Sequence, residues 1–187
     1  MRSYEERAKD FIKAIFPYLN DEWNDPYDVS CNVDVFNEEH NRKVVMHHGI
    51  ARIALITSDY VVKFDYDPDE VSVVGGGEAE VRLYALAEQD GFAHLFAKVT
   101  RYEYNGRRFY IMPRIRGISE SNWYYADHFM TEEEREWCDM HSLSDLHCNN
   151  YGFRNGHVCI VDYACTCEET YDYEESTYRT SELVSNG

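Results

Sequence analysis

Residues 145–162 read DLHCNNYGFRNGHVCIVD, and this stretch decides the fold expected of the chain. Its Asn155-Gly156 pair favours the left-handed backbone of a tight turn, so a short hairpin is predicted around it. The second strand of that hairpin would end at Asp162, beside a loop that holds Asp145 and Asn150. Two carboxylates and one amide would then converge, and these are the hard oxygen ligands that Mg²⁺ prefers.

The same residues resemble the protein-kinase-like superfamily, including small-molecule kinases of the aminoglycoside and choline type, whose catalytic loop often reads Asp-Leu-His-x-x-Asn. The resemblance implies that Asp145 orients or deprotonates an acceptor hydroxyl, that Asn150 and Asp162 hold Mg²⁺, and that ATP is the phosphate donor. Tyr163-Ala164 stands where Phe-Gly usually follows the metal-binding aspartate.

The upstream half supplies further parts of such a fold in the expected order. Short strands are predicted at residues 43–48, 51–57 and 60–65. Lys63 lies in the third of these strands. It resembles the strand lysine that grips the α- and β-phosphates of a nucleotide.

A short helix is expected over residues 78–87, after the flexible lead Gly75-Gly76-Gly77. The i, i+3, i+4 spacing predicts a buried stripe of Val81, Tyr84 and Ala85.

The resemblance implies that a carboxylate on this helix holds Lys63 toward phosphate. Glu80 is the expected partner of that lysine, and Glu78 is the alternative.

A second hairpin is expected from residues 95–104 and 107–115, joined by Asn105-Gly106. Its far end resembles the hinge segment of the superfamily, where backbone groups near Met112 to Arg114 would contact an adenine. Pro113 lies within this segment and has no N–H to donate.

Two capping boxes predict where helices begin. Thr131 with Glu134 opens a helix that runs toward Met140, directly before the catalytic loop. Ser3 with Glu6 opens an N-terminal helix, which Pro17 is expected to end or kink near Phe16. The face of this helix that packs against the body is predicted to contain Ala8, Phe11, Ile12, Ile15 and Phe16.

Phosphate binding is expected to differ from the family pattern. The glycine-rich loop is reduced to Gly49-Ile50-Ala51-Arg52, so few backbone N–H groups can wrap phosphate. Gly49 and Arg52 are the expected contacts there, with Arg52 supplying charge; an ordinary surface position is the alternative for Arg52. Leu143 and Ser144 stand where many protein kinases have His-Arg, so control by activation-loop phosphorylation is not expected.

The expected fold class is α+β: a protein-kinase-like two-lobe fold with an antiparallel N-lobe sheet and a much reduced helical C-lobe. The C-lobe is expected to be reduced because the stretch after Asp162 is too short for the usual helical lobe. The predicted divisions are an N-terminal helix and acidic loop at 1–42, an N-lobe-like sheet and helix at 43–116, and a reduced C-lobe with an acidic tail at 117–187. A chain of 187 residues with 44% hydrophobic content fits one compact body.

The formal net charge of -17 argues against nucleic acid as a direct ligand, because phosphate backbones would be repelled. It favours a basic protein partner or simple solubility. The acidic stretches at 20–28 and 168–175 are expected to be solvated loop and tail rather than docking surfaces. No stretch reaches the length of a transmembrane span, so no membrane partner is expected.

Six cysteines without a secretory signal indicate a reducing, cytoplasmic setting rather than a disulfide framework. Cys165 and Cys167 with His141 or His147 form an alternative zinc set. No second closely spaced ligand pair accompanies them, so buried or idle thiols are the favoured interpretation.

Two functional classes follow. The first is an ATP/Mg²⁺-dependent phosphotransferase that transfers the γ-phosphate to a hydroxyl acceptor. The second is a catalytically weak or inactive kinase-like binding module, a pseudokinase, that docks a basic protein. An acidic mimic of nucleic acid that retains this scaffold is a third alternative.

Overall fold

The computed structural model describes residues 2–19, 25–49, 52–65, 76–117, 129–143 and 150–163 of the 187-residue chain. Within these ranges the protein is α+β, with antiparallel sheets and helices that pack on them. The predicted fold class is therefore confirmed at this level.

The larger sheet contains β1 Val45–His48, β2 Arg52–Ile56, β3 Tyr60–Asp65, β4 Thr100–Tyr104 and β5 Arg107–Pro113. These five strands are antiparallel and lie in the order β1-β2-β3-β5-β4. The smaller sheet contains β6 Arg116–Gly117, β7 Tyr151–Arg154 and β8 His157–Ile160. Its strands are also antiparallel and lie in that order.

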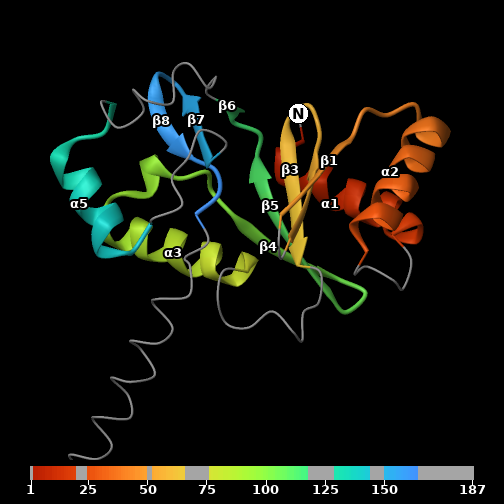
Figure 1. Ribbon diagram of the computed structural model, residues 1–187, viewed down its shortest axis with the longest axis horizontal. Helices are drawn as coiled ribbons and strands as arrows, with labels where there is room; N and C mark the ends of the chain where they lie inside the picture. Colours follow the sequence, from red (N-terminus) through yellow and green to blue (C-terminus); the bar gives the residue numbers. More distant parts are fainter. Residues whose placement is uncertain are drawn as a thin grey trace, which may run out of the picture.

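The helices among the described residues are α1 Tyr4–Ile15, α2 Pro26–His40, α3 Gly77–Asp90 and α5 Glu132–Met140, with 3₁₀ turns at Phe16–Tyr18 and Ala93–Leu95. Figure 1 shows α1 and α2 beside the larger sheet at one end of the molecule, and α3, α5 and the smaller sheet toward the other end. None of the helices in the described part of the chain is both long and apolar enough to cross a bilayer.

Both predicted Asn-Gly hairpins are confirmed. Asn105 and Gly106 have φ of 48° and 75°, and Asn155 and Gly156 have φ of 54° and 83°. Positive φ at both central residues is the signature of the type I′ turn, whose twist matches that of paired strands. The first hairpin starts later than predicted, because Leu95 ends a 3₁₀ turn and Ala97 donates to Ile160 O at 2.8 Å instead of pairing with β5.

The N-terminal helix forms as predicted. Ser3 and Glu6 make the reciprocal capping box, and the helix ends at Ile15, from which a 3₁₀ turn carries the chain through Pro17. The proline has no N–H for the α-helical ladder, so the tighter turn takes over. Of the predicted face, the buried residues are Ala8, Phe11, Ile12 and Ile15, and Phe16 is partly exposed.

The acidic loop predicted before residue 42 is partly wrong, because α2 occupies Pro26–His40. Asp25 caps it by accepting from Tyr27 N at 2.8 Å, and Asn41 closes it with φ of 50°. Its buried stripe is only Val29, Val33 and Phe36. Such a narrow apolar face among many acidic residues gives a weak helical signal, and packing against β1 and the 3₁₀ turn supplies the missing stability.

The larger sheet has two different faces. Residues Ile53, Leu55, Val62, Phe64, Phe109 and Ile111 form one core with α1 and α2. The intervening residues of the same strands point the other way, and Tyr110 and Met112 join a second core with α3, α5 and the smaller sheet. Because side chains alternate along a strand, Lys63 faces this second side.

Candidate active site

Lys63 lies in the middle of the larger sheet and is buried. Its neighbours in register are Ala54 on β2 and Tyr110 on β5, so these side chains share its face. The Lys63 ammonium lies 2.7 Å from Glu80 Oε1 and donates to Val161 O at 2.9 Å. The pairing predicted between Lys63 and Glu80 is present in the structure.

Glu80 comes from α3, whose start is fixed against the sheet. A Cβ at Gly77 would overlap the ring of Tyr110, so glycine is needed for this close approach. Gly77 N also donates to Asp65 Oδ1 at 3.3 Å, and Tyr110 OH donates to Glu78 Oε1 at 3.2 Å. These contacts hold the first turn of α3 over the end of β3 and the middle of β5.

The buried face of α3 is not the predicted one. Ala79, Glu80, Leu83 and Ala87 are buried, whereas Val81 and Tyr84 are only partly buried and Ala85 is exposed. The helix also runs to Asp90, longer than expected. The buried stripe includes the Glu80 carboxylate, because Lys63 and Arg52 compensate its charge inside the protein.

The alternative partner, Glu78, is directed elsewhere. Its carboxylate lies 3.3 Å from Arg101 and 3.8 Å from Arg108, both half-exposed on the hairpin of β4 and β5. Glu78 itself is about one-third exposed, while the Glu80 side chain has 0% exposure. The two glutamates therefore separate into a surface pair and a buried pair.

Asp162 reaches the same point from the end of β8. Its Oδ1 lies 3.4 Å from the Lys63 ammonium and 2.5 Å from Arg52 Nη2. Burial alone would raise the pKa of this carboxyl, but Lys63 and Arg52 outweigh it and hold the pKa well below its usual range. The carboxylate is therefore ionised at neutral pH, although its side chain is 41% exposed.

Arg52 begins β2 and is only 13% exposed, so the alternative of an ordinary surface charge is wrong. It contacts Glu80 Oε1 at 3.2 Å as well as Asp162. Burial alone would lower the pKa of the guanidinium. The attraction of the Glu80 and Asp162 carboxylates is larger than this effect and raises the pKa above its usual value, so Arg52 stays charged. A signal for this position was in the sequence: Arg52 alternates with the core residues Ile53 and Leu55 and so shares the face of Lys63.

A backbone hydrogen bond places Asn150 beside this cluster. Its side chain is buried, and its carbonyl accepts from Val161 N at 2.8 Å, one residue before Asp162. Asp145, the predicted catalytic residue, lies outside the described residues, as do Ile50 and Ala51 of the reduced loop. Cys165, Cys167 and His147 of the alternative zinc set also lie outside them.

The donors in the described part of the site suit Mg²⁺. Asp162 carries carboxylate oxygens and Asn150 an amide oxygen, and the two cations contact Asp162 at Oδ1. Among the described residues no cluster of three or more His, Cys, Asp or Glu side chains could form a complete metal cage. Mg²⁺ commonly uses one or two carboxylates and takes the rest of its shell from water and substrate phosphates, so this sparse donor set fits it.

The predicted contacts of Gly49 and Arg114 are occupied within the protein. Gly49 N donates to Arg52 O at 2.8 Å and closes the turn between β1 and β2. Arg114 N donates to Asp59 O at 3.0 Å, and its guanidinium donates to Thr57 O at 2.7 Å. These two backbone N–H groups therefore do not face a ligand in this arrangement.

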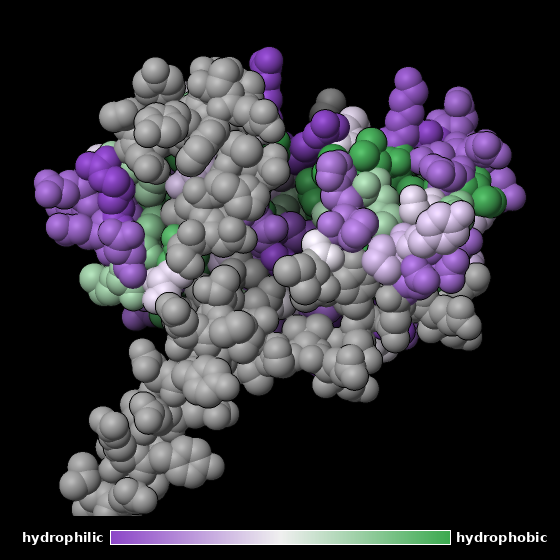
Figure 2. Space-filling view, viewed as in Figure 1, coloured by the Kyte–Doolittle hydropathy of each residue, from purple (hydrophilic) through white to green (hydrophobic). Residues whose placement is uncertain are grey.

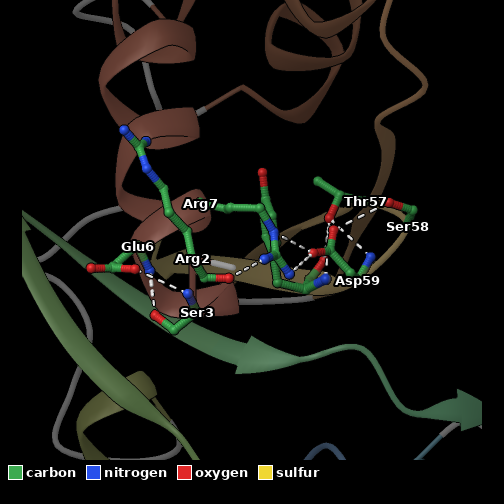
Figure 3. Close-up of polar contacts among 8 residues, drawn as sticks. Arg2, Ser3, Glu6, Arg7, Thr57, Ser58 and Asp59 are labelled. Carbon is green, nitrogen blue, oxygen red and sulfur yellow. Dashed lines mark hydrogen bonds and ion pairs between the residues drawn. The ribbon is translucent and has the colours of Figure 1, made fainter.

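The turn that engages Arg114 is also held by α1. Arg7 Nε donates to Asp59 Oδ2 at 2.8 Å, and Figure 3 shows this arginine reaching from the helix to the turn that contains Thr57 and Asp59. Met112, the other predicted hinge residue, pairs with Val61 in the sheet and buries its side chain on the Lys63 face.

No protein-family model matches the sequence, and no curated protein matches it. Solved structures with limited similarity include the Lpg2603 kinase of Legionella pneumophila bound to IP6, at 13% identity and a TM-score of 0.40, covering 66% of this chain and 47% of that one. The bifunctional kinase-methyltransferase WbdD matches at 17% identity and a TM-score of 0.32, covering 71% and 34% of the two chains. WbdD with the kinase inhibitor LY294002 matches at 18% identity and a TM-score of 0.30, covering 74% and 37%.

The chain thus spans less than half the length of each of these structures. At such TM-scores the likeness does not assign the chain to a family. The functional assignment depends on the geometry of the chain's own residues.

Proposed function

We propose that this chain is an ATP/Mg²⁺-dependent phosphotransferase of the protein-kinase-like superfamily that transfers the γ-phosphate to a hydroxyl acceptor. The observation that carries the proposal is the buried Lys63–Glu80 ion pair with Asp162 at 3.4 Å from the same ammonium. Desolvation of a charge costs several kcal/mol per ion, and the attraction within an ion pair at best balances that cost. Retention of these charges at one point of an otherwise apolar core favours a role for these residues in binding.

In this proposal each residue has one task. Glu80 holds the Lys63 ammonium in place for the nucleotide phosphates, and Asp162 with Asn150 holds Mg²⁺. When bound, the metal neutralises charge on the β- and γ-phosphates. Asp145 orients or deprotonates the acceptor hydroxyl.

The proposed two-lobe division follows from the same roles. The larger sheet and α3, within residues 43–116, carry the phosphate-binding lysine. Strands β7 and β8 and helix α5, within residues 117–187, carry the metal ligands and belong to the proposed C-lobe, and β6 extends their sheet from Arg116. Backbone groups near Met112 would contact the adenine, and the occupied N–H of Arg114 would have to be released for a similar contact.

A second function is favoured by one specific observation. Arg52 lies on Asp162, and the Gly49 N–H closes a turn, so two elements proposed for nucleotide binding are satisfied within the protein. A pseudokinase that docks a basic protein would retain such a closed cluster. Exposed acidic residues for docking are available at Glu132 and Glu133 in the first turn of α5, where Figure 2 shows a hydrophilic surface.

Thermal unfolding with nucleotide tests the binding step. ATP with Mg²⁺ is expected to raise Tm by about 5–10 °C at a ligand concentration about 100 times Kd. Asp162→Asn should abolish the Mg²⁺-dependent part of this shift. Asp139→Asn, an exposed carboxylate on α5, is the matched control and should keep it. Absence of any shift in the wild-type protein would reject the proposal.

Phosphate transfer then separates the enzyme from the binding module. Purified protein is incubated with γ-labelled ATP and pooled acceptors: a basic protein, sugars and amino alcohols. The phosphotransferase proposal predicts transfer that Asp145→Asn abolishes while nucleotide binding stays intact. Nucleotide binding without transfer to any acceptor would favour the pseudokinase.

A further inference from the structure

Arg52 has an unusual place for a residue proposed to contact nucleotide phosphate. Its guanidinium bridges the two carboxylates of the site, at 3.2 Å from Glu80 and 2.5 Å from Asp162. Asp162 is the proposed metal ligand. The Arg52 guanidinium is therefore already bound to the carboxylate that the metal cation must also bind.

The cluster is balanced in charge but not in hydrogen bonds. Two cations, Arg52 and Lys63, each contact both carboxylates, Glu80 and Asp162. Yet Glu80 Oε2 and Arg52 Nη1 are buried without a hydrogen-bond partner in the described structure. Buried polar atoms without a hydrogen-bond partner destabilise the protein. A ligand that supplies partners for these atoms, or allows them to rearrange, would therefore be bound more favourably.

Lys63 and Arg52 differ in how firmly they are held. Lys63 sits on the central strand of the sheet and has a third acceptor, Val161 O at 2.9 Å. Arg52 is the first residue of β2, directly after the turn from β1, and its guanidinium contacts the two carboxylates and lies within electrostatic reach of Asp65 on β3. Its long side chain can therefore move without disturbing a strand interior.

We propose that Arg52 is an exchangeable counter-ion for Asp162. In the absence of nucleotide it neutralises the carboxylate and competes with a divalent metal. The triphosphate of an incoming nucleotide draws the guanidinium away, because an arginine fork binds phosphate in a bidentate way, and Asp162 becomes free for the metal. Metal and nucleotide then bind cooperatively. This inference rests on the proposed nucleotide-binding function and adds its regulation.

The test measures metal binding without catalysis. Mn²⁺, which shares the preference of Mg²⁺ for carboxylate oxygen, is titrated by electron paramagnetic resonance into the full chain, with and without a non-hydrolysable ATP analogue. The variant Arg52→Gln removes the competing cation. Arg101→Gln is the matched control, because it makes the same change in net charge at a half-exposed arginine that pairs with Glu78 instead.

Arg52→Gln is expected to bind Mn²⁺ about tenfold more tightly than wild type when no nucleotide is present, within the usual range of couplings between sites. Its gain in Mn²⁺ affinity on adding the analogue should be correspondingly smaller. Arg101→Gln should behave like wild type. If Arg52→Gln does not fold, Arg52→Lys keeps a cation for Glu80 but loses the fork, and about threefold tighter Mn²⁺ binding is expected.

Two results overturn the inference and can be told apart. If the wild-type protein binds the analogue with Mn²⁺ but the Arg52 variants bind Mn²⁺ alone no more tightly, the counter-ion role is rejected and the proposed function survives. If no protein binds the analogue or Mn²⁺, both are rejected.

Discussion

The two faces of the larger sheet show how one set of strands can serve two purposes. On β3, Val62 and Phe64 pack under α1 and α2, whereas Lys63 between them lies in a cluster of four charged side chains. Adjacent residues of the same strand thus point into an apolar core on one face and into a charged site on the other. The difference follows from the alternation of side chains in a strand.

The energetics of the two faces are opposite. The face under α1 and α2 buries aromatic and aliphatic side chains, and each fully buried large apolar residue contributes about 1.5–3 kcal/mol to stability. The face toward α3 buries ions, whose desolvation is at best balanced by their pairing. The apolar face stabilises the fold, and the charged face is expected to be retained for binding.

The largest expected effect on stability lies on the apolar face. Ile12→Ala removes a fully buried side chain between α1 and the sheet and should lower the free energy of unfolding by about 2–5 kcal/mol. Chemical denaturation measures the loss. Nucleotide affinity of the remaining folded protein should be unchanged, and a variant that lost binding in proportion to stability would show that the two faces are not separate.

A smaller loss of stability is expected on the charged face. Glu80→Gln leaves Lys63 and Arg52 with a single carboxylate and should cost about 1–3 kcal/mol. Glu78→Gln, two residues earlier on the same helix, breaks only half-exposed pairs and should cost less than about 1 kcal/mol. Nucleotide binding should be lost in the first variant and kept in the second. The reverse order would assign the lysine-holding role to Glu78.

Much of this organisation could be predicted because local chemistry determined it. The Asn-Gly turns fixed both hairpins, the capping boxes fixed the starts of α1 and α5, and strand alternation put Lys63 away from the α1 core. The pair of Lys63 and Glu80 followed from the family resemblance and is present in the structure.

The errors arose where tertiary contacts outweigh the local pattern. Helix α2 has a narrow apolar stripe and is stabilised by what it packs against. The buried face of α3 includes a carboxylate, which a hydrophobic pattern cannot reveal, because only the distant cations Lys63 and Arg52 make its burial tolerable. The contact of Arg52 with Asp162 joins residues far apart in the sequence and has no local signature.

The smallest expected effect is a pH dependence of the unfolding free energy, which the charged face of the larger sheet should show and the apolar face should not. Lys63 and Arg52 outweigh the effect of burial and hold the pKa of Asp162 below its usual value of 3.8. The folded protein therefore keeps this carboxylate ionised where the unfolded chain takes up a proton, so its contribution to stability is present above about pH 4 and is lost as the pH falls below that. Because the side chain is 41% exposed, water screens the effect to about 1 kcal/mol or less.

Chemical denaturation of wild type and Asp162→Asn between pH 6 and about pH 3 measures this contribution. The difference in unfolding free energy between the two proteins should shrink as the pH falls. Ile12→Ala should instead remain destabilised by the same amount at every pH. A constant difference for Asp162→Asn would contradict the assigned ion pairs.

A comparison of two lysines tests the proposal that the sheet face containing Lys63 binds nucleotide phosphate. Calorimetric titration of ATP with Mg²⁺ is performed on wild type, Lys63→Met and Lys98→Met, the last at a half-exposed lysine that pairs with Glu5. Wild type and Lys98→Met are expected to bind ATP with Mg²⁺, and Lys63→Met is expected to lose affinity by about hundredfold or more, because a charge-assisted phosphate contact is removed. Equal affinity in all three proteins, or no binding by any of them, would contradict the proposal.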